Sequence, residues 1–472
     1  MSNSPPTGKR RAPDFKQAIV ISTAFPDTDA PPGYGPLLRL AGPVVLSRLG
    51  IMAMGLVDAI VVGRYSATEL GYQALGWAPT AVVLTTSLGL LSGIQVMTSQ
   101  AIGENRAGDT GAILRRGLRY ALWIALAAAA LLYFGGGPVM HHLGLVEGLA
   151  DGATPVLQIL ALSLIPILLG DAGMFWLEAH GRAVPGMVAI WVSNIVNLAL
   201  NVWLVPGDSG FGVEGAVASG WATFLSRLVF VAMIIGLIVT WRQSRTLGVF
   251  APTPDDAPAA AAMRRIGYGA STSYFTETLA FASMSIFAGW IGTNAVAAWA
   301  TVLNVAALVF MVPLGLATAT GVLVGRAHGA GDVAGVRLAA KRGFVLTTAA
   351  LLAISGIVAV GSDAIAAVYT RDAGVQALTA AALLLSCLFF VADGLQVVGA
   401  QACRAQSDVW IPTGTHLASY ILVMMPLGYG LAIVMGLAVD GLVWSIIVAS
   451  LMSAVLLWGR FLWLTRETAR VR

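Results

Sequence analysis

Residues 375–402 read VQALTAAALLLSCLFFVADGLQVVGAQA. Such a run is long enough to cross the hydrocarbon core of a bilayer, which takes about 20 residues of α-helix. It lacks the strict alternation of apolar and polar residues that marks a strand of a membrane barrel. Its one charged side chain, Asp393, lies inside the apolar run, where charge is costly and commonly functional. We therefore interpret this segment as a transmembrane helix that carries a functional acid.

Similar apolar runs occur along nearly the whole chain on either side of this one. They span residues 37–63, 72–101, 113–134, 154–178, 183–205, 213–241, 265–291, 295–325, 341–361, 411–435 and 440–464. Only helices and closed barrels satisfy their backbone hydrogen bonds in lipid. The sequence therefore predicts an all-α membrane protein with about twelve transmembrane helices.

The composition of the chain agrees with a membrane protein. Hydrophobic residues make up 57% of it and charged residues only 11%, whereas soluble domains have about 25% charged residues. This excludes a soluble cytosolic enzyme, a disordered scaffold and a nucleic-acid-binding protein. The two cysteines, Cys387 and Cys403, fall in one apolar segment, so no disulfide framework is expected.

Positive charge gathers in alternate loops between the predicted helices. The basic residues of these loops and of the C-terminal end are Arg106, Arg115, Arg116, Arg119, Arg182, Arg242, Arg245, Arg264, Arg265, Arg326, Arg337, Lys341, Arg342, Arg404, Arg460, Arg466, Arg470 and Arg472. The intervening loops hold only Arg64 and Arg371. Because cytoplasmic loops carry an excess of Lys and Arg, we expect both termini in the cytoplasm. Residues 1–35 hold charges and prolines but no apolar signal-peptide core, so we expect a flexible cytoplasmic tail there.

The second half of the chain repeats landmarks of the first. Asp171 and Arg182 recur 222 residues later as Asp393 and Arg404. Weaker matches join RAGD (106–109) to GAGD (329–332), and GVEG (212–215) to VDG (439–441). We therefore expect two six-helix bundles related by a pseudo-twofold axis along the membrane normal, which is a transporter layout. The expected parts are the tail 1–35, a first bundle 36–241, a cytoplasmic linker 242–264 and a second bundle 265–472.

Three polar residues of the first half are predicted to lie at one depth in the membrane. Asp58 lies about five residues before the outer end of its helix, and Asn197 and Asn201 lie about eight and four residues before the outer end of theirs. If the two helices pack together, the three side chains form a pocket that can hold a proton or help to ligate a cation. The alternative is that the amides merely link neighbouring helices.

Two further acids are predicted inside the second half. Glu277 falls near the middle of the segment 265–291, and Asp393 has Gln396 one turn after it and Phe389 one turn before it. Two carboxylates with hydroxyl and amide neighbours suit a monovalent metal cation such as sodium, with Glu277 and Asp393 as its ligands, and they equally suit a proton. The alternative is a purely structural, hydrogen-bonding role.

We expect structural roles for the remaining charged residues inside the predicted helices, with Asp171 as the exception. Glu178, four residues before Arg182, is expected to form an interfacial ion pair with it. Arg48 and Arg227 are expected to counter Asp171 or Glu178. Asp171 is also a candidate substrate contact, because it matches a functional acid in the repeat. The sequence contains no phosphate-binding loop, no cluster of metal-ligand residues and no nucleophile–base arrangement, so we do not expect an enzyme.

At these positions the chain resembles the multidrug and toxic-compound extrusion (MATE) transporters, in their NorM-like branch. The matching segments are GLVDAIVVGR (55–64), NLALN (197–201), FTE (275–277), RD (371–372), DGLQ (393–396) and PLGY (426–429). Single motifs are modest, but their order and spacing together are specific. The resemblance implies two six-helix bundles that rock around a central cavity.

The resemblance also implies a function in the inner (plasma) membrane of a bacterium. Sodium or protons would drive export of organic cations such as drugs and dyes, and the transporter would act as a monomer in the bilayer without a cofactor. Glu277 and Asp393 would bind the coupling cation, with a contribution from Asp58. Candidate substrate contacts are Asp171, Asn197, Asn201, Asp372, Phe389 and Gln396. The alternative is a flippase for a lipid-linked precursor, which would need a strongly cationic cavity.

Overall fold

The computed structural model describes residues 33–142, 148–252 and 256–471. The predicted tail, residues 1–35, lies outside the described residues except for its last three positions. The described chain is helical throughout, and we find no strand in these ranges, which confirms the predicted all-α membrane fold. Eleven helical segments of the described chain are long and apolar enough to cross a membrane.

The described residues of the first half form seven α-helices. They are α2 (Gly35–Tyr65), α3 (Ala67–Gly103), α4 (Thr110–His142), α5 (Leu149–Leu162), α6 (Leu164–Ala179), α7 (Ala183–Leu204) and α8 (Gly215–Thr240). Five of them correspond to single predicted spans. The predicted span 154–178 is divided between α5 and α6 at Ser163, whose hydroxyl donates to the Leu160 carbonyl oxygen at 2.6 Å.

In the described part of the second half, four long helices come first, a broken helix follows, and a further long helix ends it. They are α9 (Ala257–Ile291), α10 (Thr293–Gly329), α11 (Val333–Tyr369), α12 (Ala373–Arg404), α13 (Trp410–His416), α14 (Met425–Tyr429) and α15 (Ala438–Val471). The predicted segment 265–291 lies within α9. This helix is not among the eleven membrane candidates, because its polar residues lower its hydropathy.

The predicted helix at 411–435 is a chain of short helical pieces. Between α13 and α14 the residues Leu417–Met424 form wider π-helical turns, and Gly430–Val434 form a second set. Pro426 begins α14 and has no backbone N–H to donate, so the regular hydrogen-bond ladder is interrupted near it. Such turns re-aim side chains, and Tyr420 lies among them.

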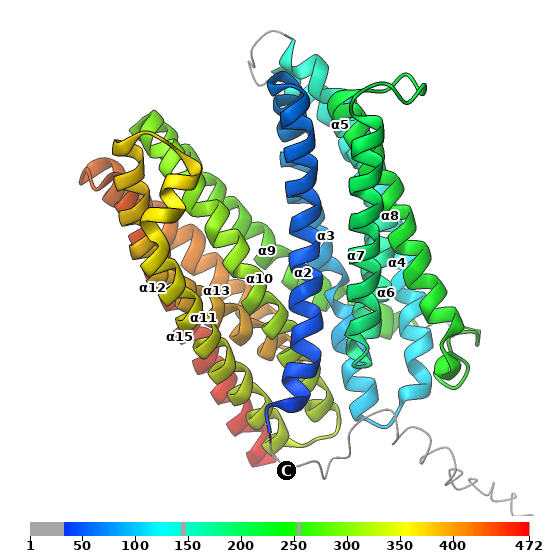
Figure 1. Cartoon of the computed structure of the whole chain (residues 1–472). Helices are drawn as coiled ribbons and strands as arrows, with labels where there is room; N and C mark the ends of the chain where they lie inside the picture. The colour runs from blue at the N-terminus through cyan, green and yellow to red at the C-terminus, as the bar shows by residue number, and fades with distance from the viewer. Residues whose placement is uncertain (1–32, 143–147, 253–255, 472) are drawn as a thin grey trace, which may run out of the picture.

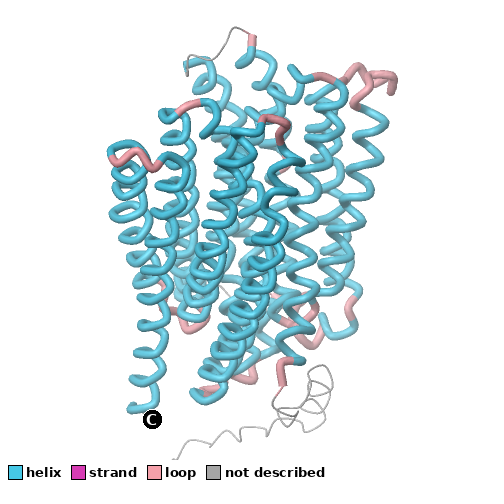
Figure 2. Tube along the Cα trace, turned by 60° about the vertical axis from the view of Figure 1, so that its left-hand side comes forward, coloured by secondary structure: helices cyan, strands magenta, loops and turns pink. Residues whose placement is uncertain are grey.

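The helices form two groups, which Figure 1 shows side by side. Helices α2–α8 make one group and α9–α15 the other. The main contacts between the groups are those of α3 with α9 and of α2 and α3 with α10. In Figure 1 the groups approach each other at the lower end and diverge toward the upper end, and the turned view in Figure 2 shows the helices running along one common direction.

Close backbone contact joins the two groups near the lower end. A Cβ placed on Gly89 of α3 would lie 2.5 Å from the Ser271 Cα of α9, so only glycine permits this crossing. Side chains add to it, because the Gln100 amide donates to the Ala405 carbonyl oxygen at 2.8 Å and to the Ser407 hydroxyl at 3.0 Å. The two halves are therefore in direct contact at this end.

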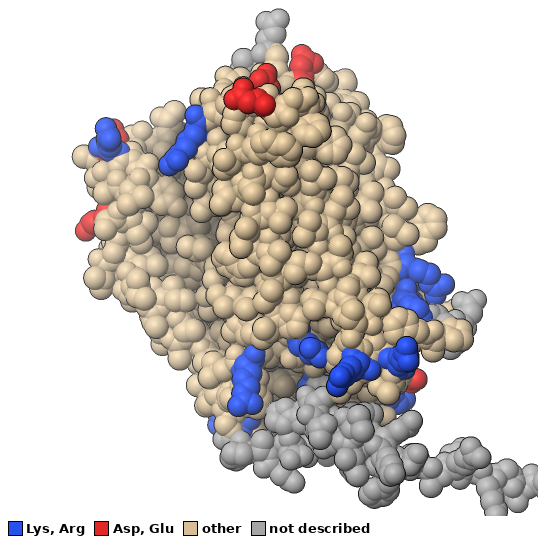
Figure 3. Space-filling view, turned by 45° about the vertical axis from the view of Figure 1, so that its right-hand side comes forward, with Lys and Arg blue, Asp and Glu red and all other residues tan. Residues whose placement is uncertain are grey.

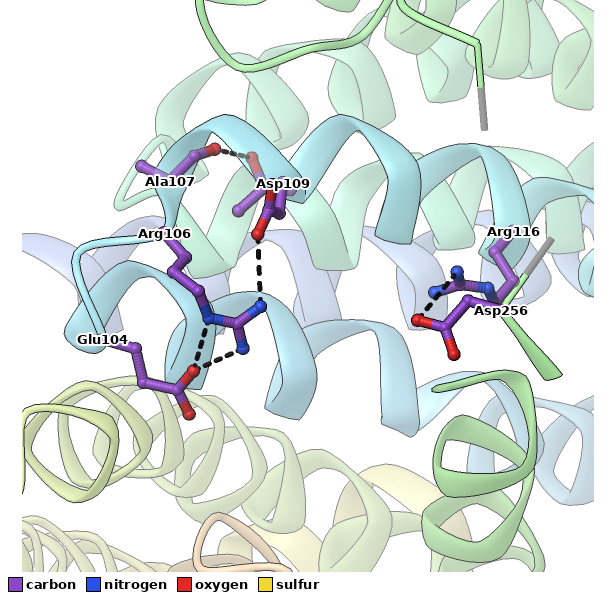
Figure 4. A network of polar contacts seen from close by, with 7 residues as sticks. Glu104, Arg106, Ala107, Asp109, Arg116 and Asp256 are labelled. Atoms are coloured by element: carbon purple, nitrogen blue, oxygen red, sulfur yellow. Dashed lines mark hydrogen bonds and ion pairs between the residues drawn. The ribbon is translucent and has the colours of Figure 1, made fainter. Parts of the chain in front are cut away.

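The segment that links the halves is anchored on the start of α4. The Gly111 amide donates to the Leu247 carbonyl oxygen at 2.7 Å. Figure 4 shows Arg116 of α4 facing Asp256, which caps α9, with 3.9 Å between Nη2 and Oδ2. The same figure shows Arg106 held between Glu104 and Asp109 just before α4. The linker thus joins the first bundle to the first helix of the second.

Charge is distributed unevenly along the long axis of the molecule. On the face shown in Figure 3, Lys and Arg gather mainly at the lower end and several acids lie at the upper end. The described chain also begins and ends at the lower end, where α2 starts and the C-terminal end of α15 is marked in Figure 1. Both features agree with the charge pattern read from the sequence.

Candidate functional site

The two acids of the second half lie together and share their hydrogen-bond donors. The Gln396 amide lies 3.4 Å from Glu277 Oε1 and 3.3 Å from Asp393 Oδ1. The Tyr420 hydroxyl lies 3.5 Å and 3.4 Å from the same two oxygens. A third donor, the Ser450 hydroxyl, lies 3.2 Å from Asp393 Oδ1. The structure therefore brings together the two acids and the glutamine that the sequence singled out.

This cluster is assembled from four segments that are distant in sequence. Glu277 comes from α9, Asp393 and Gln396 from α12, and Ser450 from α15. Tyr420 comes from the π-helical turns between α13 and α14. Sequence reasoning missed Tyr420 and Ser450, because a single tyrosine or serine in an apolar helix has no distinguishing pattern.

The cluster has the chemistry of a cation site. Asp393 is 5% exposed and Gln396 is fully buried. The Gln396 amide oxygen has no hydrogen-bond partner among the described residues, and buried polar atoms are rarely left in that condition. Two carboxylates, a spare amide oxygen and two hydroxyls are oxygen ligands that suit a monovalent metal cation, and the carboxylates equally suit a proton.

In the first half, Asp58 is held by short hydrogen bonds. The Asn201 amide donates to Asp58 Oδ1 at 2.8 Å, and the Thr223 hydroxyl donates to Asp58 Oδ2 at 2.8 Å. Asn197 is one step further away, because its amide lies 3.4 Å from the Thr223 hydroxyl. The predicted packing of the two helices around Asp58 is confirmed, and Thr223 of α8 is an addition that the sequence did not indicate.

A cavity of about 50 Å³ adjoins Asp58. Asp171 and Arg227 also line it, together with apolar side chains such as Trp77 and Phe230. The volume is enough for one or two water molecules, whereas pockets that hold drug-sized ligands measure about 300–1,000 Å³. A large substrate therefore requires the surrounding helices to move.

The expected ion pair between Glu178 and Arg182 is not formed. Glu178 Oε1 lies instead 3.4 Å from Arg48 Nη2, and its other oxygen accepts from the Gln95 amide at 2.9 Å. Arg182 lies over the Trp241 ring, 4.6 Å from its centroid. The sequence rule failed because Glu178 is buried and faces α2 and α3, whereas spacing along one helix favours pairing on an exposed face.

The other candidate substrate residues are placed separately. Asp372 caps the N-terminus of α12, where its Oδ1 accepts from the Val375 amide at 2.8 Å, and it is exposed. Phe389 is 2% exposed and packs edge-to-face on Phe390 with 4.8 Å between ring centroids. Asp372 lies at the start of α12, 21 residues before Asp393, and Phe389 lies about one turn before Asp393 in the same helix, so their predicted contacts with a substrate stay predictions.

The fold and the paired buried acids define a class, that of membrane transport proteins built from two repeated bundles. The comparison with protein families then places the chain within it. The MatE family model matches residues 43–203 and again 270–430, one match in each half. The chain therefore belongs to the MatE family, as its sequence motifs indicated.

Curated relatives cover almost the full chain. A protein from Caulobacter vibrioides named "Probable multidrug resistance protein NorM" is 47% identical, over 92% of this chain and 93% of its own. One of the same name from Bradyrhizobium diazoefficiens is 32% identical, over 91% and 93%. "Multidrug resistance protein PmpM" from Pseudomonas aeruginosa is 29% identical, over 84% and 83%.

Solved structures share the fold at low sequence identity. One titled "Outward-facing conformation of a multidrug resistance MATE family transporter of the MOP superfamily" superposes with a TM-score of 0.84 at 18% identity, over 92% of this chain and 96% of that one. A crystal structure of a eukaryotic MATE transporter gives 0.83 at 18% identity, over 92% and 97%. These matches confirm the architecture.

Proposed function

We propose that this protein is a cation-coupled antiporter that exports organic cations, including drugs and dyes, by alternating access. Sodium or protons entering the cell drive the export, and no further cofactor takes part. The protein works as a monomer in the inner (plasma) membrane of a bacterium, with both termini in the cytoplasm. The names of the relatives support the multidrug substrate class, and the basic end of the molecule supports the orientation.

The observation that carries this proposal is the shared coordination of Glu277 and Asp393. Asp393 is buried and Glu277 is half-buried, and these two carboxylates, which use the same amide and hydroxyl donors, repel each other when both are ionised. A sodium ion or a proton between them removes that repulsion. The pair is therefore a natural binding site for the coupling cation, with Gln396 and Tyr420 as additional ligands.

Transport then follows from competition for these acids. In the ionised state the pair attracts a cationic drug into the region between the halves. Binding of sodium or a proton neutralises the pair and weakens the attraction for the drug, which is released. The coupling is reciprocal, since drug binding must weaken cation binding by the same factor.

The arrangement of the two halves supports alternating access. The halves touch at the basic end through the backbone crossing at Gly89 and the hydrogen bonds of Gln100. They diverge toward the other end in Figure 1. This is the geometry expected when the cytoplasmic side is closed, and rocking of one half against the other produces the opposite state.

A flippase for a lipid-linked precursor is less well supported. A pyrophosphate headgroup needs a cluster of free basic side chains in the cavity. Arg48 is instead paired with Glu178, and Arg227 lines a cavity with Asp58 and Asp171 and interacts electrostatically with both. The membrane-depth arginines are thus engaged with the protein's own carboxylates.

Reconstitution in liposomes tests the proposed function. An organic-cation dye is followed while a sodium gradient and a pH gradient are imposed separately. We expect dye movement with one of them in the wild-type protein, and a loss of about tenfold or more in Glu277→Gln and Asp393→Asn. The matched control is Asp363→Asn, which changes an exposed acid of α11 and should keep the wild-type rate.

The contrary result is as clear. If Glu277→Gln or Asp393→Asn moves dye at the wild-type rate under an imposed gradient, the pair does not bind the coupling cation. If neither the sodium gradient nor the pH gradient drives dye movement by the wild-type protein, the proposed antiport is wrong.

A further inference from the structure

Arg227 is a buried guanidinium in the middle of the first half. It is 5% exposed and lines the same cavity as Asp58 and Asp171. Its Nη1 donates to the Ser163 hydroxyl at 2.6 Å, at the break between α5 and α6. It interacts electrostatically with both carboxylates. A fixed positive charge therefore lies in the cavity that the acids form.

Two buried atoms of this group are left without partners. Neither Arg227 Nε nor Asp171 Oδ1 has a hydrogen-bond partner among the described residues. Asp58, in contrast, has both of its oxygens engaged by Asn201 and Thr223. Asp171 is therefore compensated by charge rather than by a hydrogen bond at that oxygen, first by Arg48 and to a smaller extent by Arg227 across the cavity that both Asp171 and Arg227 line.

The internal repeat shows what the second half has at the same place. Arg227 is 12 residues after Gly215, and Ser453 is 12 residues after the matching Gly441. Helix α15 has no basic residue between Ala438 and Gly459. This part of α15 instead offers Ser450, whose hydroxyl lies 3.2 Å from Asp393 Oδ1, and Ser453, whose buried hydroxyl has no partner in the described chain.

The second half does have a buried arginine, but it lies to one side of its acid pair. Arg404 interacts electrostatically with Glu277. Its guanidinium carbon lies 5.2 Å from the centroid of the Tyr274 ring, and Tyr274 precedes Glu277 by about one turn of α9. The hydrogen bonds that Glu277 and Asp393 themselves accept come from amide and hydroxyl groups.

This difference decides which cations each site accepts. The repulsion between a guanidinium and a metal ion is strong where water is excluded. Sodium also needs several oxygen ligands around it. In a small cavity these ligands would hold the ion close to the guanidinium. A proton needs only one carboxyl oxygen and avoids this conflict. The remaining charged pair of the first half, Arg48 with Glu178, adds opposing charges near Asp171, and both members interact with it electrostatically.

We infer that the guanidinium of Arg227 supplies the positive charge that a bound ion would otherwise supply in the first half. Its repulsion excludes metal cations from Asp58 and Asp171. Sodium is thereby confined to the Glu277–Asp393 site, while the first-half acids accept at most a proton. This inference rests on the proposed function, because it assigns the coupling ion to one of two repeated sites. It also makes Arg227 a specificity-determining residue.

The test is sodium binding to the purified full-length protein, measured with radioactive sodium alone and no drug. Arg227→Ser installs the residue found at the matching position of the second half. We expect it to bind one more sodium ion per chain than the wild-type protein. The additional site should disappear in the double variant Arg227→Ser with Asp58→Asn, and Arg227→Lys, which keeps the charge, should gain no site.

Several results would overturn the inference. Equal sodium stoichiometry in Arg227→Ser and wild type is one, and a gained site that survives the Asp58→Asn change is another. Arg227→Met keeps the volume near that of arginine and serves as a second uncharged variant if Arg227→Ser does not fold, as judged by gel filtration. It should gain the same site, and failure to do so would count equally against the inference.

The outcome is separable from that of the proposed function. Dye transport by the wild-type protein tests antiport, whereas the sodium stoichiometry of the Arg227 variants tests the excluded site. A chain that transports no dye yet gains a sodium site in Arg227→Ser would contradict only the proposed function. A chain that transports dye but gains no site would contradict only the inference.

Discussion

The two halves of the molecule bury acids in related places but satisfy them differently. In the first half, Asp58 has both oxygens engaged by short hydrogen bonds and shares its cavity with Arg227. In the second half, Glu277 and Asp393 share longer contacts to neutral donors. The repeat has therefore kept the acids but not the position of the counter-charge: Arg227 lines the cavity of the first-half acids, whereas Arg404 interacts electrostatically with Glu277 from beside Tyr274. A counter-charge inside the cavity makes a structural site, and one held beside the pair leaves room for a mobile cation.

The largest expected effect separates the two sites by cation affinity. Asp393→Asn should weaken binding of the coupling cation by about 100-fold, because one of two charged ligands is lost. Asp58→Asn should weaken it by less than about threefold, since Asp58 serves mainly its own half. Isothermal titration with sodium, or proton release on drug binding, measures both. The reverse order of effects would break the comparison between the halves.

A stability measurement sharpens the same contrast. Glu178→Gln leaves Arg48 buried without its partner and should lower the free energy of unfolding by about 3–5 kcal/mol. Glu277→Gln removes one of two repelling acids, so it should leave the apparent melting temperature in detergent unchanged or raise it. Similar destabilisation by the two variants would show that the second-half pair is also held by fixed counter-charges.

The comparison extends to the basic end, where the first half buries His180 just beyond α6. Its ring packs on Trp176 and contacts Thr110, and burial lowers the pKa of His180 from its usual 6.5 to about 3. Below pH 6.5 the imidazole of His180 therefore binds a proton in the unfolded chain but not in the folded chain. The contribution of His180 to the free energy of unfolding is largest above pH 6.5 and is lost as the pH falls below that value. The loss at pH 5 should be about 2 kcal/mol.

Thermal unfolding between pH 7.5 and 5 checks this expectation. His180→Gln should flatten the pH dependence, while His141→Gln, which changes a half-exposed histidine, should not. An unaltered pH profile in His180→Gln would mean that the ring is protonated in the folded state.

The smallest effects concern single hydroxyls. Tyr420→Phe removes a donor that faces both second-half acids and should weaken cation binding about fivefold. Thr223→Val removes the hydroxyl that donates to Asp58 and should affect stability by about 1 kcal/mol rather than cation affinity. Equal effects of the two variants on cation affinity would indicate that both halves bind the same ion.

The sequence predicts the fold because the main physical constraint acts locally along the chain. A run of apolar residues must cross the bilayer as a helix, and helical rise then fixes the depth of each polar side chain. This is why the contact between Asp58 and Asn201 was predictable from two separate helices. The pairing of Glu277 with Asp393 was expected on a different basis, namely the family motifs that contain the two acids.

The features that sequence reasoning missed depend on tertiary contacts. The division at Ser163 lies just before Pro166, which has no N–H to donate to the Leu162 carbonyl, and a hydropathy pattern does not register a single proline. Both Arg182 and Arg48 were expected as partners of Glu178, and the pairing with Arg48 follows from packing in three dimensions that spacing along one helix does not show. Tyr420 reaches the acids from π-helical turns beside a proline, and a hydropathy pattern contains no signal for such turns.

The glycine crossing between α3 and α9 has a mechanical consequence. Gly89 lies about 33 Å along the helix from the start of α3 at Ala67. If the halves pivot where their backbones touch, a turn of about 10° displaces that far end by about 6 Å, while the near end at Gly103, about 21 Å from Gly89, shifts by about 4 Å. Because the pivot is nearer to one end of α3, a given rotation moves the end where the two groups diverge further than the end where the backbones are tightly packed.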